Sequence, residues 1–244
     1  MFKKEQKNLI NIKSVVANGD THGLFDAWHK LASNIRAMIP GSVLLHCGDW
    51  GAGFRNVKVE EAMQDGLNVL CCEHDVMIFV IRGNHDSKKR MEEYKNFSNI
   101  KFLDDYTYFK INGAKFGFVG GAISIDRSER VPGLSYWEDE VFVLDSSKIQ
   151  KCDVLITHSG PPYIGPCDKN GIKHFCDKDP TLWDECKRER KDHETLIKLS
   201  GSTHHRQGHL HCSCVTEKYG CESRILDIDE AREIFIEDKE NPFL

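Results

Sequence analysis

Oxygen and nitrogen donors that could bind metal ions recur in five short motifs of this chain. The motifs are NGDTHG, CGDWGAG, RGNHD, THSGPP and GHLH. Seven of their side chains are candidate metal ligands: Asp20, His22, Asp49, Asn84, His158, His209 and His211. Oxygen and imidazole ligands together favour Mn, Fe, Zn or Ni over Mg or Ca. The set is too large for one tetrahedral ion, so it predicts two ions that share a carboxylate.

Each of these residues has a simpler interpretation when it is considered alone. Asp20 and Asp49 could cap helices or make side-chain turns after strands. His158 could be a hydrogen-bonded histidine at a strand end, and Asn84 could be an ordinary turn residue. The metal-site interpretation depends on the joint pattern, because ordered motifs are far more specific together than singly.

The first half of the chain alternates predicted strands with predicted helices. Apolar, β-branched segments predict the strands, and helical periodicity predicts the amphipathic helices. The strands are 13–18, 42–47 and 76–81, and the helices are 23–39 and 58–74. This alternation favours parallel β-α-β units, whose strands end at one edge of a sheet. Residues i and i+2 of an extended chain point to the same side, so the D-x-H and H-x-H pairs could converge on one point.

The second half of the chain has a more antiparallel pattern. Alternating residues flank Asn112-Gly113, which is a strong signal for a β-hairpin. A buried strand is predicted at 152–158, where the THSGPP motif begins. Two late strands are predicted on either side of a turn near Tyr219-Gly220.

Length and composition indicate one globular domain. The chain has 244 residues, of which 40% are hydrophobic and 29% charged, as is usual for soluble proteins. There is no internal repeat, low-complexity linker or clear second-domain boundary, so residues 1–244 are predicted to form a single domain. A polar insert is predicted at about 164–200, with a helix over 181–199.

The charge and hydropathy of the chain do not indicate binding to nucleic acid or to a membrane. The formal net charge is -5, which indicates no general attraction to nucleic acid or to an anionic membrane. The first residues do not resemble a secretory signal, and no segment approaches the ~20 apolar residues of a membrane span. We therefore expect a cytoplasmic protein whose ten cysteines are reduced thiols. The sequence leaves the oligomeric state open.

The order of the motifs, D-x-H, G-D, G-N-H-D, H and G-H-x-H, resembles that of the calcineurin-like metallophosphoesterases. The resemblance extends from Gly19 to His211. It implies an α/β fold, namely a four-layer α/β/β/α sandwich of two mixed β-sheets with a dimetal site at the strand ends.

The resemblance also implies a role for each donor residue. One metal would be held by Asp20, His22, Asp49 and His211. The other would be held by Asp49, Asn84, His158 and His209. Asp49 would bridge the two ions, and His85 would be a catalytic histidine that binds no metal.

The implied activity is metal-dependent phosphoester hydrolysis with a metal-bridging hydroxide as the nucleophile. Divalent ions lower the pKa of bound water and clamp phosphoryl oxygens. Their charge would attract phosphate to an acidic protein. His85, if protonated, could donate a proton to the leaving oxygen. We expect two divalent ions, with Mn as the first choice and Fe, Zn or Ni as alternatives.

The first expectation for the substrate is a small phosphomonoester or a nucleotide. A phosphoprotein phosphatase and a phosphodiesterase are alternatives with the same chemistry. A non-catalytic binding scaffold of the same fold is an alternative of another class. The complete ligand set and the presence of His85 argue against the scaffold.

The second motif departs from the pattern of the phosphoprotein phosphatases. Those members of the superfamily have G-D-x-x-D-R-G, in which the later Asp orients the catalytic histidine and the Arg binds phosphate. Here Ala52 and Gly53 stand at those positions. The sequence therefore leaves open what orients His85, and another cation must bind phosphate. The candidates are Arg127 first, and then Arg55 and Arg130.

Overall fold

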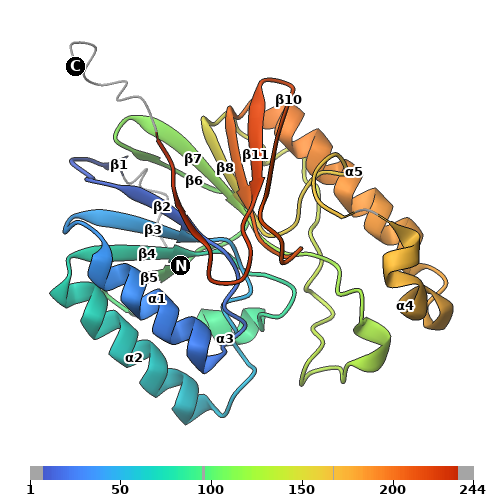
Figure 1. Ribbon diagram of the computed structural model, residues 1–244, viewed down its shortest axis with the longest axis horizontal. Helices are drawn as coiled ribbons and strands as arrows, with labels where there is room; N and C mark the ends of the chain where they lie inside the picture. The colour runs from blue at the N-terminus through green and yellow to red at the C-terminus, as the bar shows by residue number, and fades with distance from the viewer. Residues whose placement is uncertain (1–7, 95–96, 167, 236–244) are drawn as a thin grey trace.

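Two β-sheets pack face to face, and helices cover the outer face of each sheet (Figure 1). The structure is a computed structural model that describes residues 8–94, 97–166 and 168–235. The layers follow the order helix, sheet, sheet, helix. This arrangement confirms the predicted four-layer α/β sandwich with two mixed sheets.

The smaller sheet contains the predicted parallel β-α-β units. Its strands, in spatial order, are β12 (Ala231–Glu233), β2 (Val15–Asn18), β3 (Ser42–His46), β4 (Val76–Val80) and β5 (Ile100–Phe102). All neighbouring strands are parallel except β12 and β2. Asn18 pairs with His46, and His46 pairs with Val80. The strands β2, β3 and β4 therefore end at the same level, and their loops leave from one edge.

The larger sheet contains both predicted hairpins. Its strands, in spatial order, are β1 (Asn8–Leu9), β6 (Thr107–Ile111), β7 (Ala114–Val119), β8 (Val154–Thr157), β9 (His204–Gln207), β11 (Cys221–Ile225) and β10 (Cys214–Lys218). The β6–β7 hairpin turns at Asn112 and Gly113, which have φ angles of 47° and 79°. Two positive φ angles are what a type I′ turn requires. The β10–β11 hairpin turns at Tyr219 and Gly220, with φ angles of 58° and 70°.

The main hydrophobic core lies between the two sheets. Alternate strand residues point into it, such as Leu45 and Phe79 from the smaller sheet and Phe116 and Ile156 from the larger one. Burying a side chain of this size stabilises a fold by about 1.5–3 kcal/mol. The core holds the two sheets against each other and so fixes the positions of the loops at their edges.

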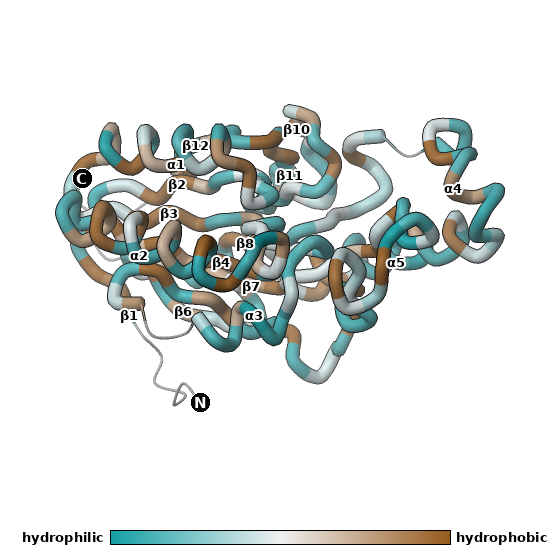
Figure 2. The backbone as a smooth tube through the Cα atoms, turned by 90° about the horizontal axis from the view of Figure 1, so that it is seen from below, coloured by the Kyte–Doolittle hydropathy of each residue, from teal (hydrophilic) through white to brown (hydrophobic). Residues whose placement is uncertain are grey.

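Amphipathic helices form the two outer layers. The helices are α1 (Phe25–Ala37), α2 (Val57–Glu73), α3 (Lys88–Glu93), α4 (Lys173–Lys178) and α5 (Leu182–Ser200), with short 3-10 helices η1 (Arg127–Glu129) and η2 (Lys169–Ile172). Leu31 of α1 and Leu67 of α2 share a cluster with Ile78 of the smaller sheet. The helices show both hydrophobic and hydrophilic residues along their length (Figure 2), as expected when one face lies on a sheet. Within the described residues, no helix combines the length and apolarity that a bilayer span requires.

Helix α5, which lies within the predicted polar insert, packs against the larger sheet. Leu196 and Ile197 of α5 are buried against Leu155 of the larger sheet. This helix is therefore the fourth layer of the sandwich. Charged residues on its exposed face, together with the buried Glu189 and Arg190, obscure the apolar stripe in the sequence. The η2–α4 segment lies beyond the end of this layer (Figure 1).

Candidate metal centre

The donor residues lie in loops at the carboxyl ends of parallel strands. They follow β2 (Asp20 and His22), β3 (Asp49), β4 (Asn84 and His85), β8 (His158) and β9 (His209 and His211). The strands β2, β3 and β4 are parallel in one sheet, and β8 and β9 are parallel in the other. The motifs therefore meet at one edge of the sandwich, where α/β proteins build binding sites.

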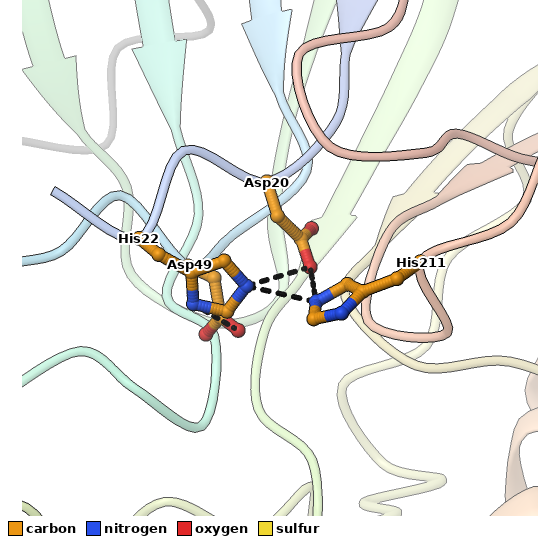
Figure 3. A group of neighbouring side chains, drawn as sticks. All are labelled: Asp20, His22, Asp49 and His211. Carbon is orange, nitrogen blue, oxygen red and sulfur yellow. Dashed lines mark hydrogen bonds and ion pairs between the residues drawn. The ribbon is translucent and has the colours of Figure 1, made fainter. Parts of the chain in front are cut away.

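Asp20, His22, Asp49 and His211 converge on one point (Figure 3). One ligand atom from each lies within 4.8 Å of the others. His22 Nε2 and His211 Nε2 are 2.8 Å apart, and His211 Nε2 is 3.1 Å from Asp20 Oδ2. His22 Nδ1 faces Asp49 Oδ2 at 3.6 Å. Two imidazoles and two carboxylates this close together fit a divalent cation, and they are the set predicted for one metal.

A second group of donors surrounds the other oxygen of Asp49. His158 Nδ1 donates to the carbonyl oxygen of Cys47 at 2.8 Å. His158 Nε2 then faces Asn84 Oδ1 at 2.9 Å and Asp49 Oδ1 at 3.3 Å. Asn84 Nδ2 donates to the hydroxyl of Ser124 at 2.9 Å, which orients the amide oxygen toward the site. A metal-binding histidine typically donates a hydrogen bond from one ring nitrogen to a backbone carbonyl, while its other nitrogen faces the metal site. His158 has this arrangement.

His209 completes the second group. Its ring centroid lies 5.0 Å from that of His158, and its backbone N–H donates to Asp20 Oδ2 at 3.0 Å. Asp49 faces His22 with one oxygen and His158 with the other. The structure thus brings together all the ligands predicted from the sequence, while their coordination of metal stays a prediction.

The second group requires positive charge in the protein interior. Burial opposes a charge on His158, but Asp49 outweighs burial and raises the pKa of His158 to about 10. Burial likewise opposes ionisation of Asp49, but the charged His158 holds the pKa of Asp49 well below its usual value. A charged carboxylate with so little exposure must have a cationic neighbour. This requirement is a further property that fits a cation site.

Several ligands have a backbone conformation that is rare for residues other than glycine. The φ angles are 49° for His22, 52° for Asp49, 66° for His209 and 44° for His211. Such left-handed conformations cost roughly 1–3 kcal/mol each and cluster at functional sites. The D-x-H and H-x-H pairs are therefore not extended, and the geometric reason predicted for their convergence is wrong. Tight left-handed turns direct these side chains instead.

Gly208 allows the β9 loop to pass directly over Asp20. A Cβ atom at Gly208 would lie 1.9 Å from Asp20 Oδ1, so Gly208→Ala must displace this carboxylate. We expect metal binding, measured by calorimetry with Mn, to weaken by about 10–100-fold. Gly66→Ala in α2 is the matched control, because nothing lies within 4 Å of its added Cβ. The control should keep its metal affinity and gain about 0.5–1 kcal/mol of stability. Equal affinities in the two variants would contradict the prediction.

Asp86 holds two of the motif loops together, and sequence reasoning missed this residue. Its carboxylate accepts hydrogen bonds of 2.8 to 3.1 Å from the backbone N–H groups of Trp50, Gly51, Ala52 and Gly83. Three of these groups lie in the loop that carries Asp49, and the fourth lies beside Asn84. The only signal in the sequence is the position of Asp86 directly after His85, which is weak because Asp is common in turns.

His85 lies beside both groups and is oriented by three contacts. Its backbone N–H donates to Asp49 Oδ1 at 2.8 Å. Its ring stacks on Phe54, with centroids 5.4 Å apart and an interplanar angle of 21°. Arg130 Nη2 lies 2.6 Å from His85 Nε2. These contacts orient the histidine although Ala52 replaces the aspartate of the phosphoprotein phosphatases.

The contact with Arg130 defines the proton on His85. A guanidinium group donates hydrogen bonds and cannot accept them, so His85 Nε2 is the acceptor. Burial lowers the pKa of His85 to about 4, and Arg130 adds to the effect. In this arrangement the imidazole is neutral. The predicted donation of a proton by His85, if it takes place through Nε2, therefore requires Arg130 to move away from this atom.

Arg127 is engaged outside the group of donors. Its Nε donates to Asp179 at 2.7 Å, and its Nη1 donates to Glu185 at 2.6 Å. These bonds connect η1 to the start of α5. Arg55 donates to a backbone carbonyl. Arg127 as a substrate ligand stays a prediction, and Arg130 is the candidate arginine that contacts His85.

A family profile and two solved structures agree with this architecture, and a third structure is less similar. The sequence profile described as calcineurin-like phosphoesterase matches residues 13–213. One solved structure has a TM-score of 0.54 and 16% identity, over 89% of this chain and 90% of that chain. The GAP50 anchor in the inner membrane complex of Plasmodium has a TM-score of 0.50 and 11% identity, over 87% and 70%. The phosphopantetheinyl hydrolase of Mycobacterium tuberculosis has a TM-score of 0.48 and 14% identity, over 91% and 90%. No curated protein sequence matches the chain significantly.

Proposed function

Because the chain belongs to the calcineurin-like phosphoesterase family, we propose that it is a dinuclear metal-dependent phosphatase of small phosphomonoesters or nucleotides. The observation that carries this proposal is the position of Asp49. Its two carboxylate oxygens face His22 and His158, which belong to different groups of donors. A carboxylate between two donor sets suits a pair of ions better than one ion.

The donors would divide between two cations as the family resemblance implies. The first set is Asp20, His22, Asp49 and His211, and the second is Asp49, Asn84, His158 and His209. Bound divalent cations would activate water at neutral pH and neutralise charge on the phosphoryl group. We propose Mn for both, because oxygen and imidazole ligands are mixed in each set.

Arg130 and His85 supply the chain's own contacts to the phosphoryl group. Arg130 Nε is held by Asp126 Oδ1 at 2.6 Å, which directs Nη2 toward His85. Guanidinium groups bind phosphate oxygens in pairs of parallel hydrogen bonds. A phosphate beside His85 would draw Arg130 toward itself and so free His85 Nε2 to take up a proton from solvent, which it could then donate to the leaving oxygen. Arg130 thus takes the role for which the sequence offered Arg127.

The cavity beside the donors has the size of a small-molecule site. Its volume is about 540 Å³, and its lining includes Asp49, Asn84, His85 and Arg130. Sites for small ligands typically enclose about 300–1,000 Å³. This volume favours a small phosphomonoester or nucleotide over a phosphoprotein, whose chain would need a longer open groove.

Hydrolysis assays with metal-depleted protein and added Mn test the proposal. We expect turnover of an aryl phosphomonoester at least about tenfold faster than that of the matching diester, since one good ionic contact alone contributes this factor. Faster turnover of the diester would indicate a phosphodiesterase. Folded, metal-loaded protein that hydrolyses neither compound would favour the non-catalytic scaffold.

A further inference from the structure

The geometry points to a substrate whose single phosphoryl group is attached to a flat, apolar group, which lies against an apolar wall of the cavity that also holds the metal donors. This inference names the substrate class and rests on the proposed phosphatase function. The apolar wall is made of Ile123, Ile125, Ile172, Phe175, Trp183 and Leu210.

The apolar wall and the donor residues share one cavity. The same space of about 540 Å³ is lined by Asp49 and His209 and also by Phe175 and Trp183. A molecule whose phosphoryl group lies at the donors therefore extends toward these aromatic side chains. Three of the six wall residues, Ile172, Phe175 and Trp183, belong to η2, α4 and the first turn of α5.

The wall is supported from behind and is only partly buried. Ile123, Cys176 and Leu182 form a small buried cluster, and Phe175 and Trp183 pack against it. The two rings are thus held in place while part of their surface still faces the cavity. A ligand that covers such apolar surface removes it from water, which makes the free energy of binding more favourable. Aromatic rings on a fixed support also favour flat partners, which stack on them.

The positive side chains that line the cavity near the wall already form ion pairs or hydrogen bonds within the protein. Lys187 binds Asp184 at 2.8 Å. Arg190 donates to the backbone carbonyls of Pro161 and Pro166, at 2.8 and 2.5 Å. Arg130, which we assign to the phosphoryl group, lies beside His85.

The lining of the cavity also includes acidic side chains near the wall. Asp126 pairs with Arg130, and Asp168 accepts a hydrogen bond from the backbone of Asn170 at 3.0 Å. Glu189 is buried, which raises the pKa of its carboxyl to about 7. These acidic side chains disfavour a second phosphate near the wall, because like charges repel. A single phosphoryl group on an apolar remainder matches both the donors and the wall.

Two aryl phosphates with leaving groups of similar acidity provide the test. We expect kcat/KM for 2-naphthyl phosphate to exceed that for phenyl phosphate by at least about tenfold, since added apolar contact in a pocket gives this discrimination. Phe175→Ala and Trp183→Ala should each reduce the ratio toward one. Phe235→Ala, a change at a side chain that is 79% exposed and outside the cavity, should leave it unchanged. Phe175→Leu provides a milder variant if an alanine variant fails to fold.

Binding of non-hydrolysable compounds gives an independent measurement. Calorimetry with Mn-loaded protein should show 2-naphthylphosphonate binding at least about tenfold more tightly than methylphosphonate. Equal kcat/KM values for the two esters, or equal affinities for the two phosphonates, would overturn the apolar-wall inference and leave the phosphatase proposal standing. Hydrolysis of neither ester by folded, metal-loaded protein would overturn the phosphatase proposal and the inference with it.

Discussion

Asp49→Asn is expected to lower kcat/KM for an aryl phosphomonoester by at least about 10³-fold, which corresponds to about 4 kcal/mol of transition-state stabilisation. The effect is large because one side chain serves both groups of donors. Asp49 Oδ1 faces His158 at 3.3 Å, and Asp49 Oδ2 faces His22 at 3.6 Å. Asparagine keeps the volume of the side chain but removes its charge and one oxygen. Metal content, measured on the same sample, should fall below that of the unmodified protein.

Asp65→Asn is the matched control for this substitution. Asp65 is exposed on α2 and does not line the cavity with the donors. The same change of chemistry there should alter neither metal content nor turnover. Thermal unfolding of both variants without metal would separate loss of the site from loss of the fold. Full metal content and full activity in Asp49→Asn would contradict the shared-carboxylate arrangement.

The general position of the site could be predicted because it depends on local patterns. Alternation of strands and helices predicted parallel strands, and parallel strands end at one edge of a sheet. The turn at Asn112-Gly113 was predictable because it needs residues that tolerate positive φ angles. Motifs that follow successive strands therefore had to lie close together, whatever the path of the loops.

The details of the site could not be predicted because they depend on loop paths. No sequence pattern shows that His22 and Asp49 have left-handed backbones, since the surrounding contacts impose this conformation. The bonds of Asp86 to Trp50 and its neighbours join loops that are more than thirty residues apart. Such contacts exist only after the two strands have been brought side by side.

The choice among the arginines also depends on loop paths that the sequence does not show. Arg127 and Arg130 are one turn apart in the chain, and their residue type and charge are the same. The 3-10 helix η1 and the residue after it direct them to different partners. Arg127 binds Asp179 and Glu185, while Arg130 reaches His85. A shift of three residues therefore separates a structural ion pair from a contact with the site.

Arg130→Ala is the substitution that distinguishes these two arginines. It should lower kcat/KM for a phosphomonoester by about 10²-fold, the usual cost of removing one preorganised donor to a developing negative charge. Arg127→Ala should change kcat/KM far less, and its loss of two ion pairs should appear as a lower thermal stability. The inhibition constant of inorganic phosphate gives a second measurement, since it should rise in the first variant only. Arg130→Lys should restore little of the kcat/KM that Arg130→Ala loses, because an ammonium group cannot form the paired hydrogen bonds of a guanidinium group. A larger loss of kcat/KM in Arg127→Ala than in Arg130→Ala would return the phosphate-binding role to Arg127 and remove Arg130 from the mechanism.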